Sequence, residues 1–233
     1  MARRCKICLV LGAGGVRGLS HLGVLQVLER EGIPIDYLVG TSAGSIVGAA
    51  YALEPDAMEI TRRALEYFGG EEFERSSFSA LIPDSRGPQP GLVQNVINGV
   101  RKGYVFSNLL RKQSILPGEK MSVMIDSLLP DLDFKDTKIP FAIPALDLKT
   151  GDDVLITRKS IRQAVIAGCA IPGFFPPVEY NDRLLTDSGI VCPVPVSAAL
   201  KEFKPDVLIA VDIMNRIEKK EDFPHGLDVL LRS

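Results

Sequence analysis

The sequence has little net charge, few histidines and cysteines, and no long hydrophobic run. Its 27 basic and 29 acidic residues leave a formal net charge of −2. This charge gives no electrostatic reason to expect binding to nucleic acid or to a strongly anionic membrane surface. The longest uncharged run, Tyr37 to Leu53, is at the lower length limit for a membrane span. Because it contains three glycines, we interpret it as a buried strand, turn and helix.

The four cysteines do not suggest a disulfide framework or a metal site. Cys5 and Cys8 have Cys-x-x-Cys spacing, but they fall on an expected strand, where residues three apart point to opposite faces. Cys169 and Cys192 stand alone, so we expect reduced thiols, as in the cytoplasm. The short apolar run after the basic N-terminus is typical of a first strand rather than a signal peptide. A cytoplasmic protein is expected, and peripheral contact with a membrane stays open.

The most informative segment is the pentapeptide Gly40-Thr41-Ser42-Ala43-Gly44. It lies between an apolar run typical of a strand and a small-residue run typical of a helix. A Gly-x-Ser-x-Gly at such a junction is the nucleophile elbow, whose tight turn requires glycine at Gly40 and Gly44. The following helix would direct free N–H groups and its positive dipole end toward Ser42. The alternative is a glycine-rich turn that merely contains serine.

A second glycine cluster, residues 12–18, follows an apolar strand and precedes an amphipathic helix. The dinucleotide fingerprint fails because Arg17 stands where glycine or alanine is needed. The phosphate-binding loop of nucleotide hydrolases fails because Gly18 is followed by Leu19-Ser20. A nucleotide-binding module is therefore the weaker alternative. The loop still offers bare N–H groups to an anion, such as the oxyanion of a tetrahedral intermediate.

A third element is Asp187-Ser188-Gly189, at the end of a short apolar strand that enters a Gly/Pro-rich loop. An aspartate in this position is well placed to face a site. Taken alone, the same pattern also fits a simple turn or cap.

Together these segments resemble the patatin-like phospholipase family, from about residue 5 to the C-terminus. The glycine loop, the elbow, the run Ala170 to Val178 and Asp187 occur in the family's order. The resemblance implies an α/β fold, namely a three-layer α/β/α arrangement with a mostly parallel central sheet. It also implies hydrolysis of lipid acyl esters by a Ser–Asp dyad without histidine.

The chain departs from the family's pattern at Ala13, Ser188 and Cys192. Ser188 stands in place of a glycine and would be strained if its backbone were left-handed. We expect these changes to affect catalytic efficiency more than the fold. The alternative function is a regulatory or binding protein that keeps the fold and has little activity.

The expected mechanism is two-step acyl transfer. Ser42 attacks an ester carbonyl and Asp187 accepts its proton, while backbone donors at Gly14, Gly15 and Val16 stabilise the oxyanion. Three interpretations of Arg17 stay open: it anchors the loop, it meets a phosphate headgroup, or it is a solvated charge at the start of the helix. The expected partner is a lipid or acyl-ester substrate; no metal or cofactor is required, and the oligomeric state is not indicated.

Two histidines, His21 and His225, keep a triad open as an alternative. The order Ser42, Asp187, His225 mimics that of α/β-hydrolases. Two features favour the dyad: only one clear strand precedes the strand of the elbow, and His225 lies close to the C-terminus. His21 is interpreted as a packing or capping residue.

The hydrophobic pattern predicts one α/β domain over residues 1–233. Residues 68–117 lose the strand-and-helix rhythm and predict a lid or binding insertion. The C-terminal residues are typical of a helix that is just starting, so we expect a polypeptide that is cut short. Expected strands are 5–11, 35–40, 139–147, 153–157, 184–186 and 206–212; expected helices are 19–31, 43–53, 56–67, 119–129, 160–170 and 195–202.

Overall fold

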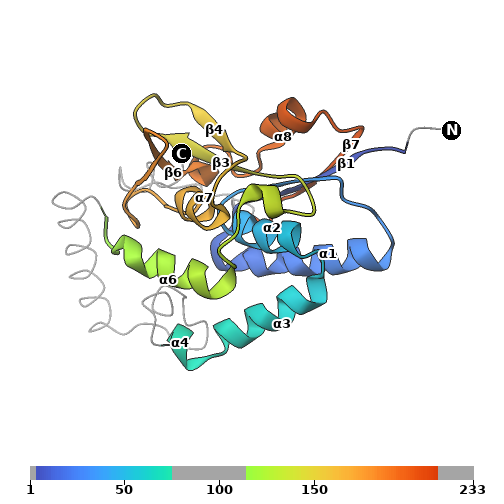
Figure 1. The fold of residues 1–233 in the computed structure, drawn as a ribbon, viewed down its shortest axis with the longest axis horizontal. Helices are drawn as coiled ribbons and strands as arrows, with labels where there is room; N and C mark the ends of the chain where they lie inside the picture. Colours follow the sequence, from blue (N-terminus) through green and yellow to red (C-terminus); the bar gives the residue numbers. More distant parts are fainter. Residues whose placement is uncertain (1–3, 75–113, 215–233) are drawn as a thin grey trace, which may run out of the picture.

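The computed structural model describes residues 4–74 and 114–214, which form one seven-stranded sheet with helices on both faces (Figure 1). The strands are β1 (Ile7–Leu11), β2 (Tyr37–Gly40), β3 (Phe141–Asp147), β4 (Asp153–Ile156), β5 (Val178–Tyr180), β6 (Arg183–Asp187) and β7 (Val207–Val211). The α-helices are α1 (Ser20–Arg30), α2 (Ala43–Leu53), α3 (Ala57–Phe68), α4 (Glu71–Glu74), α6 (Gly118–Leu128), α7 (Ile161–Gly168) and α8 (Val196–Phe203). Short 3-10 helices are η1 (Gly15–Leu19), η3 (Phe134–Asp136) and η4 (Ser188–Ile190).

Four strands form the parallel part of the sheet, in the order β3-β2-β1-β7. The central strand β1 is apolar throughout because helices cover both of its faces. Side chains alternate along a strand, so Leu9 and Leu11 join the core beneath α1 and α2, whereas Cys8 and Val10 lie under α8. Figure 1 shows α8 across the sheet from α1, α2 and α3. The predicted three-layer α/β/α fold is confirmed.

Three antiparallel strands complete the sheet beyond the parallel part. β4 returns beside β3 through a turn at residues 148–152, where Gly151 has a φ of 79°. The second half of β3 also pairs with β6, placing Ala145 opposite Asp187, and β5 pairs with β6. β5 was not predicted, since three residues are too few to show an alternating pattern.

Every strand and helix expected from the sequence is present, with boundaries that differ by at most two residues. Two cysteine placements differ from expectation: Cys5 precedes β1, and Cys169 follows α7 instead of lying within it. In the predicted insertion, residues 68–74, which include α4, and residues 114–117 are described, and Ser114 pairs with Gly173. The rest of that insertion and His225 lie outside the described residues. The single domain and the lid therefore stay predictions, as does the cytoplasmic location. Within the two described ranges, every helix is too short or too polar to traverse a membrane.

Candidate active site

Ser42 occupies a strained backbone position between β2 and α2. Its φ of 53° and ψ of −125° match the first central position of a type II′ turn, which glycine normally occupies. A residue other than glycine in such a conformation costs of order 1–3 kcal/mol and persists only where its surroundings hold it. Ser42 is also largely buried. The predicted elbow is thus present, with the serine at its strained corner.

The two glycines of the elbow are required by close approach. A Cβ added at Gly40 would lie 2.3 Å from the carbonyl oxygen of Gly44, and one at Gly44 would lie 2.3 Å from that of Leu11. Both neighbours are backbone atoms, which cannot rotate away as a side chain can. The start of α2 therefore packs directly onto the end of β1, from which the glycine loop departs.

The glycine loop continues from β1 into η1. The N–H groups of Gly12 and Ala13 are bonded to the carbonyls of Val211 and Pro193, so unpaired donors start only where the turn η1 starts. The first bond of this turn runs from the N–H of Arg17 to the carbonyl of Gly14, at 3.2 Å. The N–H groups of Gly15 and Val16 precede that bond, as the first N–H groups of a helix do. Gly15 has a φ of 55°, and both residues line the cavity that contains Ser42. This is the place predicted for an oxyanion hole.

Arg17 and His21 both bond to the backbone of the loop. The exposed Arg17 places its Nε 3.4 Å from the carbonyl of Gly14, which fits the anchoring interpretation. His21 is fully buried and its Nε2 donates to the carbonyl of Gly12 at 2.8 Å. Burial lowers the pKa of His21, although this hydrogen bond raises it in part. His21 is therefore a neutral loop anchor whose Nε2 is already engaged, a contact that the sequence alone did not reveal.

Asp187 ends β6 and lies beside Ser42. Its side chain is almost fully buried, and Oδ1 accepts a hydrogen bond from the N–H of Gly189 at 2.7 Å. Burial raises the pKa of the carboxyl group above its usual value, while hydrogen bonds from the Ser42 side chain and the Gly189 N–H partly lower it. A buried carboxylate with a raised pKa is a stronger base than one in water.

The departures from the family's pattern fit this geometry without strain. Among the described residues, Ser188 is not one of those with a positive φ, so a serine adopts this backbone readily. Ala13 is buried, and a Cβ added at Gly189 would lie 2.9 Å from the Ala13 Cβ. Cys192 donates to the carbonyl of Val194, at 3.7 Å, away from the serine's own contacts.

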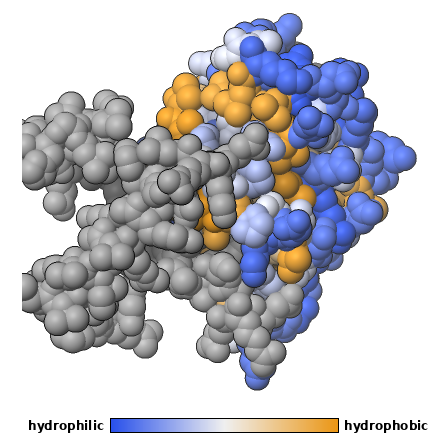
Figure 2. Space-filling view, turned by 90° about the vertical axis from the view of Figure 1, so that its left-hand side faces the viewer, coloured by the Kyte–Doolittle hydropathy of each residue, from blue (hydrophilic) through white to orange (hydrophobic). Residues whose placement is uncertain are grey.

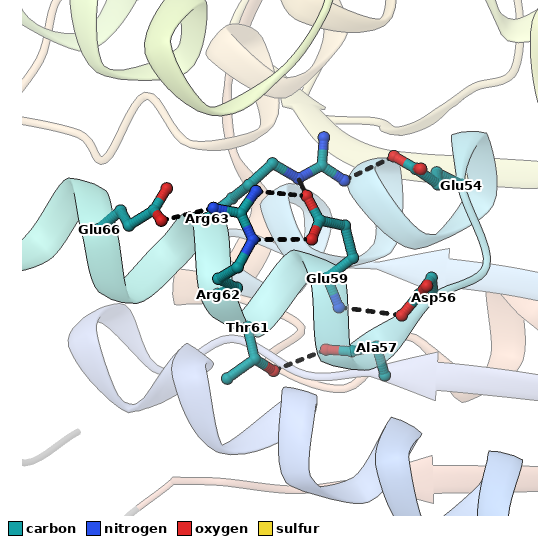
Figure 3. Close-up of polar contacts among 8 residues, drawn as sticks. All are labelled: Glu54, Asp56, Ala57, Glu59, Thr61, Arg62, Arg63 and Glu66. Carbon is teal, nitrogen blue, oxygen red and sulfur yellow. Dashed lines mark hydrogen bonds and ion pairs between the residues drawn. The ribbon is translucent and has the colours of Figure 1, made fainter.

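A cavity of about 460 Å³ extends from Ser42 between the helices. Its lining is apolar apart from a few groups, and Arg63 is the one charged side chain among the described residues that line it. Arg63 pairs with Glu54 and Glu59 at the start of α3 (Figure 3), at 2.7 and 3.5 Å. The cavity wall comes from α2, α3, α6 and the segment after α7, with further contributions from Gly15, Val16, Gly18, Leu19, Leu22, Phe73 and Ser42.

The cavity reaches the surface at exposed apolar residues. Val16 and Phe174 both line it, and their side chains are 58% and 42% exposed. Figure 2 shows hydrophobic residues gathered on the side of the molecule that carries α6 and the β6 end of the sheet. Phe68 and Phe73, at the described start of the predicted insertion, also line the cavity. Within the described parts of the chain, no three His, Cys, Asp or Glu side chains gather as metal ligands.

A serine at a strained strand-to-helix turn, beside a carboxylate, is typical of α/β proteins with a nucleophile elbow. The geometry of that elbow suits acyl transfer. Within that class, the family model for patatin-like phospholipases matches residues 9–200. The chain belongs to the patatin-like phospholipase family, as its sequence motifs predicted.

Similar proteins are much longer than this chain. An uncharacterized NTE family protein of Mycobacterium tuberculosis is 31% identical over 215 residues, which cover 92% of this chain and 31% of that protein. Lysophospholipase NTE1 of Candida glabrata is 30% identical over 207 residues, covering 89% of this chain and 10% of its own length. Patatin-like phospholipase domain-containing protein 6 of Homo sapiens is 28% identical, and the match covers 91% of this chain and 14% of that protein. Among solved structures, VipD from Legionella pneumophila gives a TM-score of 0.47 at 16% identity, covering 82% of this chain and 47% of that one.

The packing at the elbow predicts opposite effects of alanine at two glycines. Gly44→Ala should lower the free energy of unfolding by about 3 kcal/mol or more, because the new methyl group meets backbone atoms. Gly23→Ala is the control, since Gly23 lies in α1 with open space around it and alanine favours helix by up to about 1 kcal/mol. Urea denaturation measures both, and a Gly44 variant as stable as the wild type would contradict the close approach.

The strain at Ser42 predicts a difference in stability between two variants of this residue. Ser42→Gly should be more stable than Ser42→Ala by about 1 kcal/mol, because glycine adopts this backbone without strain. The larger conformational entropy of glycine in the unfolded state cancels only part of that gain. Thermal unfolding of the two variants provides the comparison. Equal stability would mean that the backbone of Ser42 is relaxed in solution.

Proposed function

We propose that this chain hydrolyses the carboxylic esters of lipids, with Ser42 as nucleophile and Asp187 as base. The observation that carries the proposal is that the strained Ser42, on the wall of an apolar cavity, meets the buried carboxyl group of Asp187. The names of the relatives, lysophospholipase and patatin-like phospholipase, support a lipid substrate. The chain spans less than a third of the length of those relatives, so the proposal rests on the geometry of the chain's own site.

The reaction proceeds in two steps. The Ser42 Oγ attacks the ester carbonyl carbon while its proton passes to Asp187, and the resulting tetrahedral intermediate collapses as the leaving alcohol takes that proton back. Water then attacks the acyl-enzyme, Asp187 accepts a proton from it, and the fatty acid leaves as Ser42 is reprotonated. Both steps need one group that alternates between base and acid, and the raised pKa of Asp187 suits this role.

The negative charge of each intermediate needs donors that are already in place. The N–H groups of Gly14, Gly15 and Val16 are assigned to this oxyanion hole, because the turn η1 begins there and lies along the cavity. Removal of one such donor typically costs a factor of about 100 to 1,000 in rate. Arg17 and His21 hold the loop through the carbonyls of Gly14 and Gly12.

The cavity is suited to the acyl chain of the substrate. Each methylene group that it removes from water contributes about 0.8 kcal/mol. Arg63 adds little free charge because Glu54 and Glu59 neutralise it. The exposed Val16 and Phe174 at the opening fit peripheral contact with a lipid surface, where the substrate resides. Of the lid predicted for residues 68–117, the described Phe68 and Phe73 line this cavity.

Replacing either proposed catalytic residue tests the dyad. Ser42→Ala should abolish hydrolysis and fluorophosphonate labelling, and Asp187→Asn should lower kcat/KM by at least about 100-fold because the base is lost. His225→Gln is the control for a triad and should retain wild-type activity. A folded His225 variant that is slowed about a thousandfold would favour the triad.

The raised pKa of Asp187 predicts how both activity and stability depend on pH. Activity should fall, as pH decreases, at a value above the ordinary aspartate pKa of about 3.9. A carboxyl group with a raised pKa stabilises the fold below its unfolded pKa, and this contribution is lost as pH rises through the folded pKa. Asp187→Asn should therefore be at least as stable as the wild type at pH 7, measured by thermal unfolding. A clear loss of stability would contradict the burial cost assigned to this carboxylate.

Acyl-chain length tests the assignment of the cavity. Across a series of monoacyl esters, kcat/KM should rise about fourfold for each added methylene group until the cavity is full. Ala64→Leu, in the cavity wall on α3, should shorten the preferred chain and leave turnover of an acetyl ester unchanged. A rate that is independent of chain length would exclude the cavity as the acyl site.

A further inference from the structure

The backbone carbonyl of Ser42 accepts an unusual number of hydrogen bonds. The N–H of Ser45 donates to it at 2.8 Å, and the Ser45 Oγ donates to it at 2.6 Å. The Sγ of Cys169 donates to the same oxygen at 3.2 Å. Three donors therefore converge on the carbonyl of the residue whose φ and ψ are the most strained in the elbow.

Ser45 lies in the first turn of α2 and its side chain is fully buried. A serine hydroxyl that bonds three or four residues back competes with the regular helix and is not needed to form it. The backbone of Ser45 packs closely against Gly40, and its Oγ would lie 3.9 Å from a Cβ added at Gly168, so the side chain is enclosed on that side. The hydroxyl is thus held against the carbonyl of Ser42.

Cys169 reaches the same carbonyl from a distant part of the chain. It caps the C-terminus of α7, is almost fully buried, and lines the cavity. Its Sγ also lies 3.4 Å from the Ser45 Oγ, so Ser42, Ser45 and Cys169 form a closed triangle of polar contacts. Burial and the charge of Asp187 raise the pKa of the Cys169 thiol, while a hydrogen bond with Ser45 lowers it in part. The sulfur consequently keeps its proton and remains a donor.

We propose that Ser45 and Cys169 are positioning residues that hold the backbone of Ser42 in its strained conformation and thereby aim its Oγ. The inference rests on the proposed role of Ser42 as nucleophile. The strain at Ser42 would otherwise be relieved by rotation of its peptide, which would carry the Oγ away from Asp187. A hydroxyl hydrogen bond from Ser45 and a weaker thiol hydrogen bond from Cys169, both on one acceptor, oppose that rotation.

Kinetics of single-residue variants test this role. Ser45→Ala and Cys169→Ala should each lower kcat about 3- to 10-fold with KM unchanged, and should slow fluorophosphonate labelling of Ser42 by the same factor. Cys169→Ser should recover most of the rate, because it differs from the alanine variant by a hydroxyl that can donate. A short-chain aryl ester is the substrate, so that changes in the cavity wall do not affect KM.

The matched control is Thr137→Ala. Thr137 also bonds a carbonyl three residues back, to Phe134 at 2.8 Å, on the connection between α6 and β3. It should retain wild-type kinetics, with folding of every variant checked by thermal unfolding. If Ser45→Ala is too unstable to assay, the pair Cys169→Ala and Cys169→Ser decides alone.

Two kinds of failure are distinguishable. A wild-type chain that is neither labelled nor active removes the proposed function and this inference with it. A labelled, active wild type whose alanine variants keep their kcat and labelling rate overturns the positioning role only. An effect on KM alone, an equal loss in Thr137→Ala, or a Cys169→Ser variant as slow as Cys169→Ala would also overturn it.

Discussion

The close approach of α2 to β1 is the constraint on which the site depends. Neither a methyl group at Gly44 nor one at Gly40 fits, because backbone atoms of the neighbouring segments are already in contact distance. This packing brings the elbow next to the start of the glycine loop, at the edge where parallel strands end and where ligands bind in open α/β sheets. It also forces Ser42 into a conformation that glycine would prefer, so the proposed nucleophile and the strained position are the same residue.

Burial then sets the protonation of the groups around that residue. Removal from water disfavours every charged form, and the same cause acts on three different side chains. It raises the pKa of Asp187 and of Cys169 and lowers that of His21. The results are a more basic carboxylate, a thiol that stays protonated and a neutral imidazole that donates to the loop. The proposed site thus combines its proposed base with two fixed donors.

The sequence predicted those parts of the site that local patterns encode. Glycine spacing located the elbow and the loop, and the apolar strand before Asp187 located the aspartate, because tight turns restrict the residues that can form them. The contacts of His21 with Gly12 and of Cys169 with Ser42 were not predictable, since they join segments whose proximity only the folded sheet determines. β5 was missed because it is short. Helix ends shifted by a few residues, as capping rather than periodicity decides them.

β3 has a further consequence for when the protein acquires its chemistry. Among the described strands, β3 is the one that connects the strand of Ser42 to that of Asp187, because it pairs with β2 at Phe141 and Ala142 and with β6 at Ala145 to Asp147. The ribosome delivers Ser42 long before β3, and β3 before Asp187. A nascent chain therefore carries the serine without its proposed base, and the proposed pair comes together only when this late, long-range pairing forms. The topology itself delays assembly of the proposed site until the sheet is complete.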